Sequence, residues 1–62
     1  MGRKQDILKA AIELFGERGY TATSTAFLAK KAGVAEGLIF DHFKNKQGIL
    51  AHILVELSDA YR

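Results

Sequence analysis

The sequence predicts an all-α fold, in which three helices pack as one unit and a fourth, linking helix begins. Apolar residues recur at intervals of three and four along most of the 62 residues, which is the spacing of one helix face. Proline, which breaks helices, is absent, and Gly19 and Gly33 lie between the periodic segments, where glycine can end a helix. A chain of this length forms one domain with a small core, so nearly every apolar residue is needed for packing.

The first helix is expected from about Lys4 to Arg18. Its charged residues fall on one side and its apolar residues on a broad face opposite, which comprises Ile7, Leu8, Ala11, Ile12, Leu14 and Phe15. Gly19 follows, where a left-handed residue would end the helix without a Cβ clash. Tyr20 is then placed to fold back onto the helix end.

A second, short helix is expected to begin at Thr23 or Ser24, because either hydroxyl can accept a hydrogen bond from the unpaired N–H groups of a helix start. Its inner face consists of Leu28, Ala29 and Ala32. Gly33 ends this helix after about two turns, and Val34 is the apolar residue that fixes the turn to the core.

A third helix must follow almost at once, from about Glu36 to His42, with Ile39 and Phe43 facing inward. Asn45 can then cap a fourth helix that continues to the end of the chain. The boundaries that follow are residues 1–45 for the three-helix domain and residues 46–62 for the start of the fourth helix.

Two short helices joined by a tight glycine turn form a helix-turn-helix unit, whose second helix fits the major groove of DNA. A small side chain at Ala29, four residues before Gly33, lets the two helices cross closely. The core of the unit is expected to consist of Leu28, Ala29, Gly33, Val34 and Ile39. From this spacing alone, a helical hairpin that touches no DNA is an equally good interpretation.

Charge and composition exclude several classes of site. The formal net charge of +2 indicates a nucleic-acid partner only if the positive groups cluster, and a solvated surface is the alternative. There is no cysteine, and two histidines ten residues apart cannot form a tetrahedral site, so no metal or cofactor is expected. The N-terminus lacks the apolar core of a signal peptide, and no run approaches the roughly 20 apolar residues of a membrane span. A cytoplasmic protein without a membrane partner is therefore expected.

The order of these residues resembles the amino-terminal domain of the tetracycline-repressor (TetR) family. The matching positions are Ile7-Leu8, Ala10-Ala11, Leu14-Phe15, Gly19-Tyr20, Thr23-Ser24, Leu28-Ala29, Ala32-Gly33-Val34, Gly37, His42-Phe43 and Lys46. They cover about the first 50 residues in one unbroken register. The resemblance implies a transcriptional regulator, expected to be a repressor, that binds double-stranded DNA.

The resemblance also implies contacts to DNA phosphates. Hydroxyl groups at the start of the second helix can bind a phosphate with help from the helix dipole, although capping alone also explains them. A lysine in the first turn of the fourth helix is unfavourable unless it has another task, so Lys46 is the strongest single candidate. The full set of expected phosphate contacts is Thr23, Ser24, His42, Lys46, Arg3 and Lys4.

The third helix departs from the family pattern. Phe40 replaces a usual tyrosine, Ala35 a usual capping serine, Leu38 a small or hydroxyl residue, and Phe27 the acidic residue of a capping box. No arginine, lysine, asparagine or glutamine is available there for paired hydrogen bonds to a purine. The expected neighbours of the base edges are Glu36, Gly37, Leu38, Phe40 and Asp41, with solubility as the alternative role of the two carboxylates.

The fourth helix is apolar around more of its surface than three short helices can cover. The residues concerned are Ile49, Leu50, Ala51, Ile53, Leu54, Val55 and Leu57. In the resembling family this helix leads into a domain that binds a small-molecule effector and forms the homodimer, so both partners are expected to act through residues beyond Arg62. A dimer would read a palindromic operator.

Protein docking and catalysis are the two alternatives to DNA binding. A small protein-interaction module could dock through the apolar fourth helix, and salt separates it from DNA binding, because only phosphate contacts weaken steeply as salt rises. Catalysis is disfavoured, since Ser24, Asp41 and His42 have the right atoms but neighbouring side chains on a short helix diverge.

Overall fold

The computed structural model describes residues 2–60, together with the side chains of residues 2–59. Four helices follow one another: α1 (Arg3–Arg18), α2 (Thr25–Ala32), α3 (Glu36–Phe43) and α4 (Lys46–Ala60). These residues include no strand, which confirms the predicted all-α fold. In the same residues, no helix has both the length and the apolar content that a membrane crossing requires.

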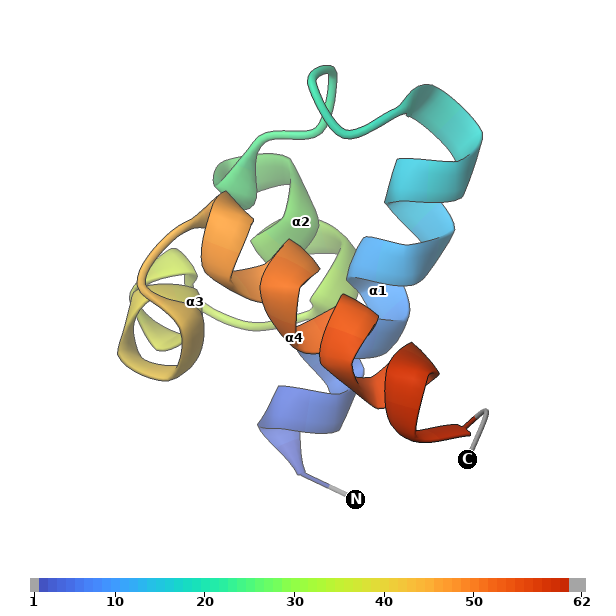
Figure 1. The fold of residues 1–62 in the computed structure, drawn as a ribbon. Coiled ribbons are helices and arrows are strands. Elements are labelled where there is room, and N and C mark those ends of the chain that lie inside the picture. The colour runs from blue at the N-terminus through green and yellow to red at the C-terminus, as the bar shows by residue number, and fades with distance from the viewer. Residues whose placement is uncertain (1, 61–62) are drawn as a thin grey trace.

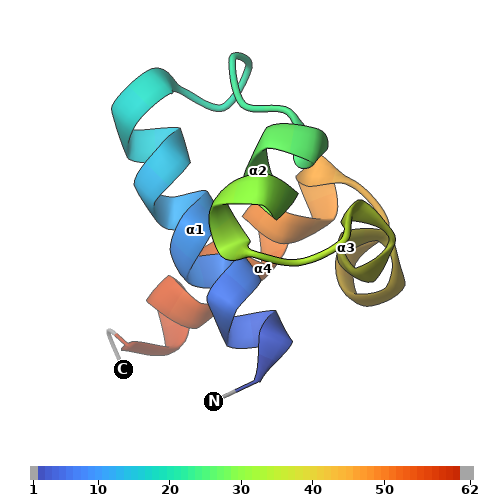
Figure 2. The same ribbon diagram turned by 180° about the vertical axis from the view of Figure 1, so that it is seen from behind.

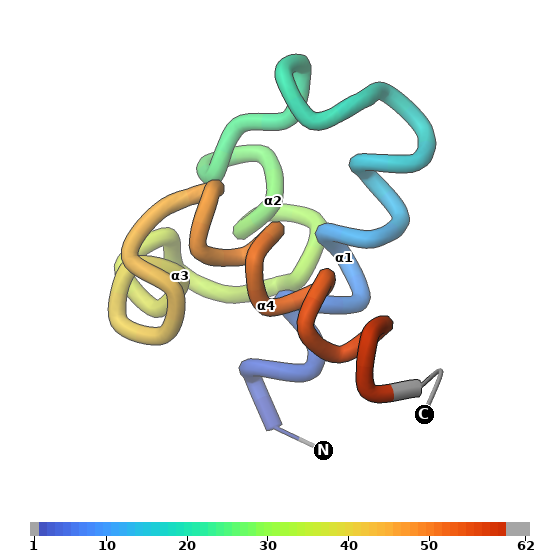
Figure 3. The backbone as a smooth tube through the Cα atoms, viewed as in Figure 1, coloured from blue at the N-terminus to red at the C-terminus, as the bar shows by residue number. Residues whose placement is uncertain are grey.

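The four helices surround one core and leave α3 at the edge of the molecule (Figure 1). Seen from behind, α2 crosses in front of α4, and α3 again lies at the outer edge (Figure 2). The chain path shows the long connection between α1 and α2 at one end and both termini at the other (Figure 3). The helix that was expected to read DNA thus lies at the edge of the domain in both views.

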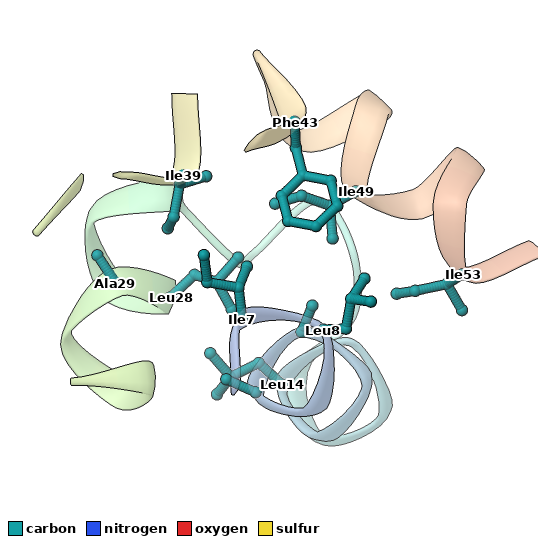
Figure 4. Close-up of a cluster of buried hydrophobic side chains, with 11 residues drawn as sticks. Ile7, Leu8, Leu14, Leu28, Ala29, Ile39, Phe43, Ile49 and Ile53 are labelled. Atoms are coloured by element: carbon teal, nitrogen blue, oxygen red, sulfur yellow. The ribbon is translucent and has the colours of Figure 1, made fainter. Parts of the chain in front are cut away.

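The core receives apolar side chains from every helix (Figure 4). Its buried members are Ile7, Leu8, Ala10, Ala11, Leu14, Leu28, Ala29, Ile39, Phe43, Ile49 and Ile53. Burial of each large aliphatic side chain stabilises the fold by about 1.5–3 kcal/mol. Of the residues expected in the helix-turn-helix core, Leu28, Ala29 and Ile39 are buried, and Val34 is partly buried and packs against the hydrophobic core.

The turn between α2 and α3 is fixed by backbone geometry at Gly33. This residue has φ 75° and ψ 32°, the left-handed conformation that commonly ends a helix, and it ends α2 as the sequence predicted. The N–H group of Val34 donates to the carbonyl oxygen of Ala29 at 3.0 Å, and that of Gly33 donates to Lys30 at 3.3 Å. These two bonds satisfy carbonyl groups that the helix end would leave unpaired, so the turn ends α2 and aims α3.

The start of α2 also follows the prediction, with Ser24 as the capping residue. Its hydroxyl oxygen accepts a hydrogen bond from the N–H group of Phe27 at 3.1 Å. The first helix differs slightly from expectation, because it begins at Arg3 and ends at a Gly19 with φ 86° and ψ 158°. Gly19 thus has the positive φ that favours glycine without the left-handed helical ψ that was predicted. Tyr20 folds back as expected, with its ring 5.2 Å from that of Phe15.

A very tight turn joins α3 to α4. Asn45 donates its N–H to the carbonyl oxygen of Phe43 at 2.8 Å, across Lys44, which has φ 72° and ψ −48°. This three-residue turn is strained for a residue with a side chain. The side chain of Asn45 accepts from the N–H group of Gly48 at 2.8 Å and caps α4 as predicted. A Cβ at Gly48 would meet the carbonyl oxygen of Phe43, so the close approach of the two helices requires glycine there.

We expect Gly33→Ala to lower the free energy of unfolding by about 1–2 kcal/mol, because alanine is strained in the left-handed region. Denaturant titration followed by circular dichroism measures this change. Gly16→Ala is the matched control, since Gly16 lies in α1 with nothing within 4 Å of an added Cβ. That substitution should raise the free energy of unfolding by up to about 1 kcal/mol. Equal effects of the two substitutions would contradict the importance of the turn.

Candidate nucleic-acid interface

The third helix buries one side and exposes the other. Ile39 is fully buried and Phe43 nearly so, whereas 47% of Phe40 is accessible to solvent. Gly37 and Asp41 are exposed as well. An exposed aromatic ring on an eight-residue helix has no partner within the core, so this side of α3 is available to another molecule.

Of the five residues expected beside base edges, four lie on the exposed part of α3: Glu36, Gly37, Phe40 and Asp41. Leu38 differs, because it is half-buried and packs against the hydrophobic core. Its main role in this structure is to hold α3 onto the rest of the domain. The prediction of a base contact for Leu38 therefore applies at most to its accessible part.

Gly37 has no packing reason to be glycine. An added Cβ would meet nothing within 4 Å, and φ at this position is not positive. Glycine in a helix costs about 1 kcal/mol relative to alanine. The missing side chain thus leaves the helix backbone at Gly37 open to close approach by another molecule.

The start of α3 lacks a side-chain cap. Ala35 is the capping residue, and its side chain supplies no acceptor to the N–H groups of the first turn. This outcome was expected from the replacement of a usual serine. The positive end of the helix dipole therefore lies open beside Glu36 and Gly37, where it favours negatively charged groups.

The expected role of Thr23 is wrong in this structure. Its side chain is completely buried, and its hydroxyl group donates to the carbonyl oxygen of Gly19 at 2.8 Å. A phosphate cannot reach a hydroxyl in that position, so Thr23 instead fixes the connection between α1 and α2. Ser24 is exposed, so of the two expected hydroxyl residues it is the one that a phosphate could reach.

Lys46 also has a role that the sequence did not indicate. Its Nζ donates to the carbonyl oxygen of Tyr20 at 2.8 Å and lies 4.4 Å from the centre of the Tyr20 ring. These contacts connect the start of α4 to the connection between α1 and α2. They explain why a cation occupies the first turn of α4, where it opposes the helix dipole. One donor of the ammonium group is thus used within the domain, and a contact of Lys46 with a DNA phosphate stays a prediction.

A second cation lies against an aromatic ring near the start of α2. The guanidinium carbon of Arg18 lies 4.3 Å from the centre of the Phe27 ring. The sequence analysis did not predict this contact of Phe27. The signal was weak, because an exposed phenylalanine and an arginine nine positions earlier show no regular spacing.

The remaining expected phosphate contacts are all exposed. His42 lies on α3, with its ring 6.1 Å from that of Phe43, and Arg3 and Lys4 belong to the first turn of α1. The two basic residues are thus both helical. Their contacts with DNA stay predictions.

The surface shows no enclosed site for a small molecule. Residues 2–60 form no pocket, and they contain no group of three side chains able to hold a metal ion. What these residues do present is a short exposed helix, held by a left-handed turn against a second short helix. This arrangement defines the chain as a helix-turn-helix domain.

The comparison with protein families agrees with this class. The family model described as bacterial regulatory proteins, tetR family, matches residues 7–53. The chain belongs to this family, as the resemblance in its sequence indicated. Members of the family are DNA-binding transcriptional regulators and not enzymes.

Curated relatives point the same way. The chain is 48% identical over 52 residues to the uncharacterized HTH-type transcriptional regulator YvkB of Bacillus subtilis, which is 84% of this chain and 28% of that protein. It is 44% identical over 50 residues to the fatty acid metabolism regulator protein of Bacillus subtilis, covering 81% and 26%. It is 38% identical over 53 residues to the HTH-type transcriptional repressor KstR2 of Rhodococcus jostii, covering 86% and 26%. The chain thus spans about a quarter of the length of these relatives.

We expect Lys46→Ala to lower the free energy of unfolding by about 1–2 kcal/mol, because the substitution removes a hydrogen bond and a cation–π contact. Thermal and denaturant unfolding measure the change. Lys44→Ala is a suitable control, because Lys44 is exposed and near in sequence. A Lys46→Ala variant with parental stability but weaker binding to every DNA sequence would show that Lys46 acts mainly as a phosphate contact.

Proposed function

We propose that this chain binds double-stranded DNA in a sequence-specific way, as the reading head of a transcriptional repressor, with α3 in the major groove. The observation that carries the proposal is the exposed side of α3, where Gly37 and Phe40 have no packing role within the domain. Membership of the TetR family supports DNA binding. The similarity to KstR2, which is named a transcriptional repressor, supports repression as the direction of regulation.

The size of α3 suits the proposed position. An α-helix with its side chains is about 10–12 Å across, and the major groove is about 12 Å wide. At Gly37 the backbone can come close to base edges, and the Phe40 ring can contact a thymine methyl group. Sequence preference would then depend largely on shape and apolar contact, with few paired hydrogen bonds.

Phosphate contacts would hold α3 in register. The N-terminal end of α2, which Ser24 caps, and the uncapped N-terminal end of α3 are both suited to phosphate groups. Exposed His42, Arg3 and Lys4 complete the proposed set. Such contacts position a protein on DNA without reading sequence, so they should contribute equally to all duplexes.

We further propose that two copies bind a palindromic operator, and that a small-molecule effector acts through a part of the protein outside these 62 residues. The greater length of the relatives supports this, since the chain spans only 28% of YvkB. In α4, Leu54, Val55 and Leu57 are exposed, as expected for a helix that continues into further structure. The same exposed residues favour the alternative, a module that docks on another protein.

Salt dependence separates DNA binding from apolar docking. We expect the affinity of the chain for duplex DNA to fall by at least tenfold between about 50 and 200 mM salt, because bound phosphates release counterions. Fluorescence anisotropy with a labelled duplex measures it. Binding that is unchanged over this range would favour docking through α4.

We expect Gly37→Leu to weaken DNA binding at least tenfold and to leave the fold intact, because the new side chain points into open space where the groove floor would lie. Gly16→Leu is the matched control: Gly16 is also an exposed helical glycine with nothing within 4 Å. It should show similar or higher stability and parental DNA affinity. If Gly37→Leu bound DNA with the affinity of the parent, the proposed position of α3 in the major groove would be wrong.

A further inference from the structure

One side-chain hydrogen bond joins the first residues of α2 and α3. The hydroxyl group of Thr25 donates to Oε2 of Glu36 at 2.7 Å. Thr25 is half-buried and Glu36 is exposed, so the bond lies at the rim of the surface that α3 presents. It fixes a flexible glutamate side chain in one orientation relative to both helices.

The bond uses only part of the carboxylate. A carboxylate accepts hydrogen bonds on both oxygens and donates none. Within residues 2–60, Oε1 of Glu36 has no hydrogen-bond partner, and the salt bridge between described side chains joins His52 and Glu56 instead. Glu36 therefore retains a free, oriented acceptor with no cation beside it.

The position of this acceptor bears on which DNA base α3 could recognise. The first residues of a recognition helix are those that contact base edges, and Glu36 is the first residue of α3. A bare carboxylate on a surface that faces DNA phosphates is repelled by them, unless it receives hydrogen bonds there. Glu36 also gains from the positive end of the α3 dipole, which offsets part of that repulsion.

The major groove offers two base donors, the N4 amino group of cytosine and the N6 amino group of adenine. Adenine carries the acceptor N7 directly beside N6, and an acceptor-only carboxylate is repelled by it. Cytosine presents its amino group without an adjacent acceptor on the same base. A fixed carboxylate oxygen therefore discriminates in favour of cytosine.

We propose that Thr25 and Glu36 form a cytosine-reading pair, in which Oε1 of Glu36 accepts from cytosine N4 and Thr25 holds Oε2. Thr25 is the positioning residue and Glu36 is the residue that determines specificity. The inference rests on the proposed function, because it assigns a base to a helix already placed in the groove. Neither the family match nor the relatives' names assign these roles.

The experiment is selection from a random duplex pool at low salt, followed by sequencing of the bound fraction. Four chains are compared: the parent, Thr25→Ser, Thr25→Val and Glu36→Gln. The parent should select a site with cytosine at one fixed position. Glu36→Gln should change that base to adenine, since an amide pairs with both N6 and N7. At that position the ratio of selected adenine to selected cytosine should rise by about tenfold relative to the parent, with the rest of the site unchanged.

The Thr25 variants test positioning. Valine has the shape of threonine without the hydroxyl group, so Thr25→Val should reduce the preference for cytosine severalfold. Thr25→Ser keeps the hydroxyl group and should keep the preference. Circular dichroism shows whether each variant is folded, and Glu36→Gln alone decides the base assignment if Thr25→Val does not fold.

Three outcomes overturn the inference while leaving the proposed function intact. The first is an unchanged selected site in Glu36→Gln. The second is that Glu36→Gln binds all DNA sequences more tightly by the same factor, which would mean that Glu36 only repels DNA phosphates. The third is equal base preference in Thr25→Val and the parent, which would remove Thr25 from the pair. A parent chain that enriches no sequence at any salt concentration would instead overturn the proposed function itself.

Discussion

The left-handed turn at Gly33 is the constraint on which the rest of the interface depends. Because Gly33 closes α2 through two backbone hydrogen bonds, α3 must leave at a fixed angle to α2. Ile39 and Phe43 then pack into the core on one side, which leaves the opposite side of α3 uncovered. A short helix that is stable only through its packed side can present a free side without losing its orientation. The recognition surface is thus a consequence of the turn and of two apolar anchors.

The charges of the domain are used differently from the pattern expected of a basic DNA-binding surface. Arg18 and Lys46 each lie against an aromatic ring, and Lys46 is also bonded to a backbone carbonyl. Both cations thereby hold segments of the domain together. Glu36 and Asp41 meanwhile add negative charge to the exposed part of α3. With a formal net charge of only +2, the long-range attraction of the domain to a polyanion such as DNA is modest.

The fourth helix belongs to two environments along its length. Its first half contributes Ile49 and Ile53 to the same core as the other three helices. Its second half exposes Leu54, Val55 and Leu57, which no other described part of the chain covers. The bond between Lys46 and Tyr20 and the tight turn at Lys44 connect the start of this helix to both ends of the helix-turn-helix unit. A displacement of α4 would therefore be transmitted to α2 and α3 through those two contacts.

The sequence by itself determined the features whose causes are local. Helical periodicity, the cap at Ser24, the stop at Gly33 and the cap at Asn45 depend on residues within about five positions of each other, so their spacing can be read directly. Partial burial of Leu38 and complete burial of Thr23 were not predicted, because burial depends on how helices pack. The tertiary structure alone decided the pairs that are distant in the chain. Lys46 meets Tyr20 across 26 positions and Thr25 meets Glu36 across 11, and only the angles between packed helices bring such atoms within hydrogen-bonding distance.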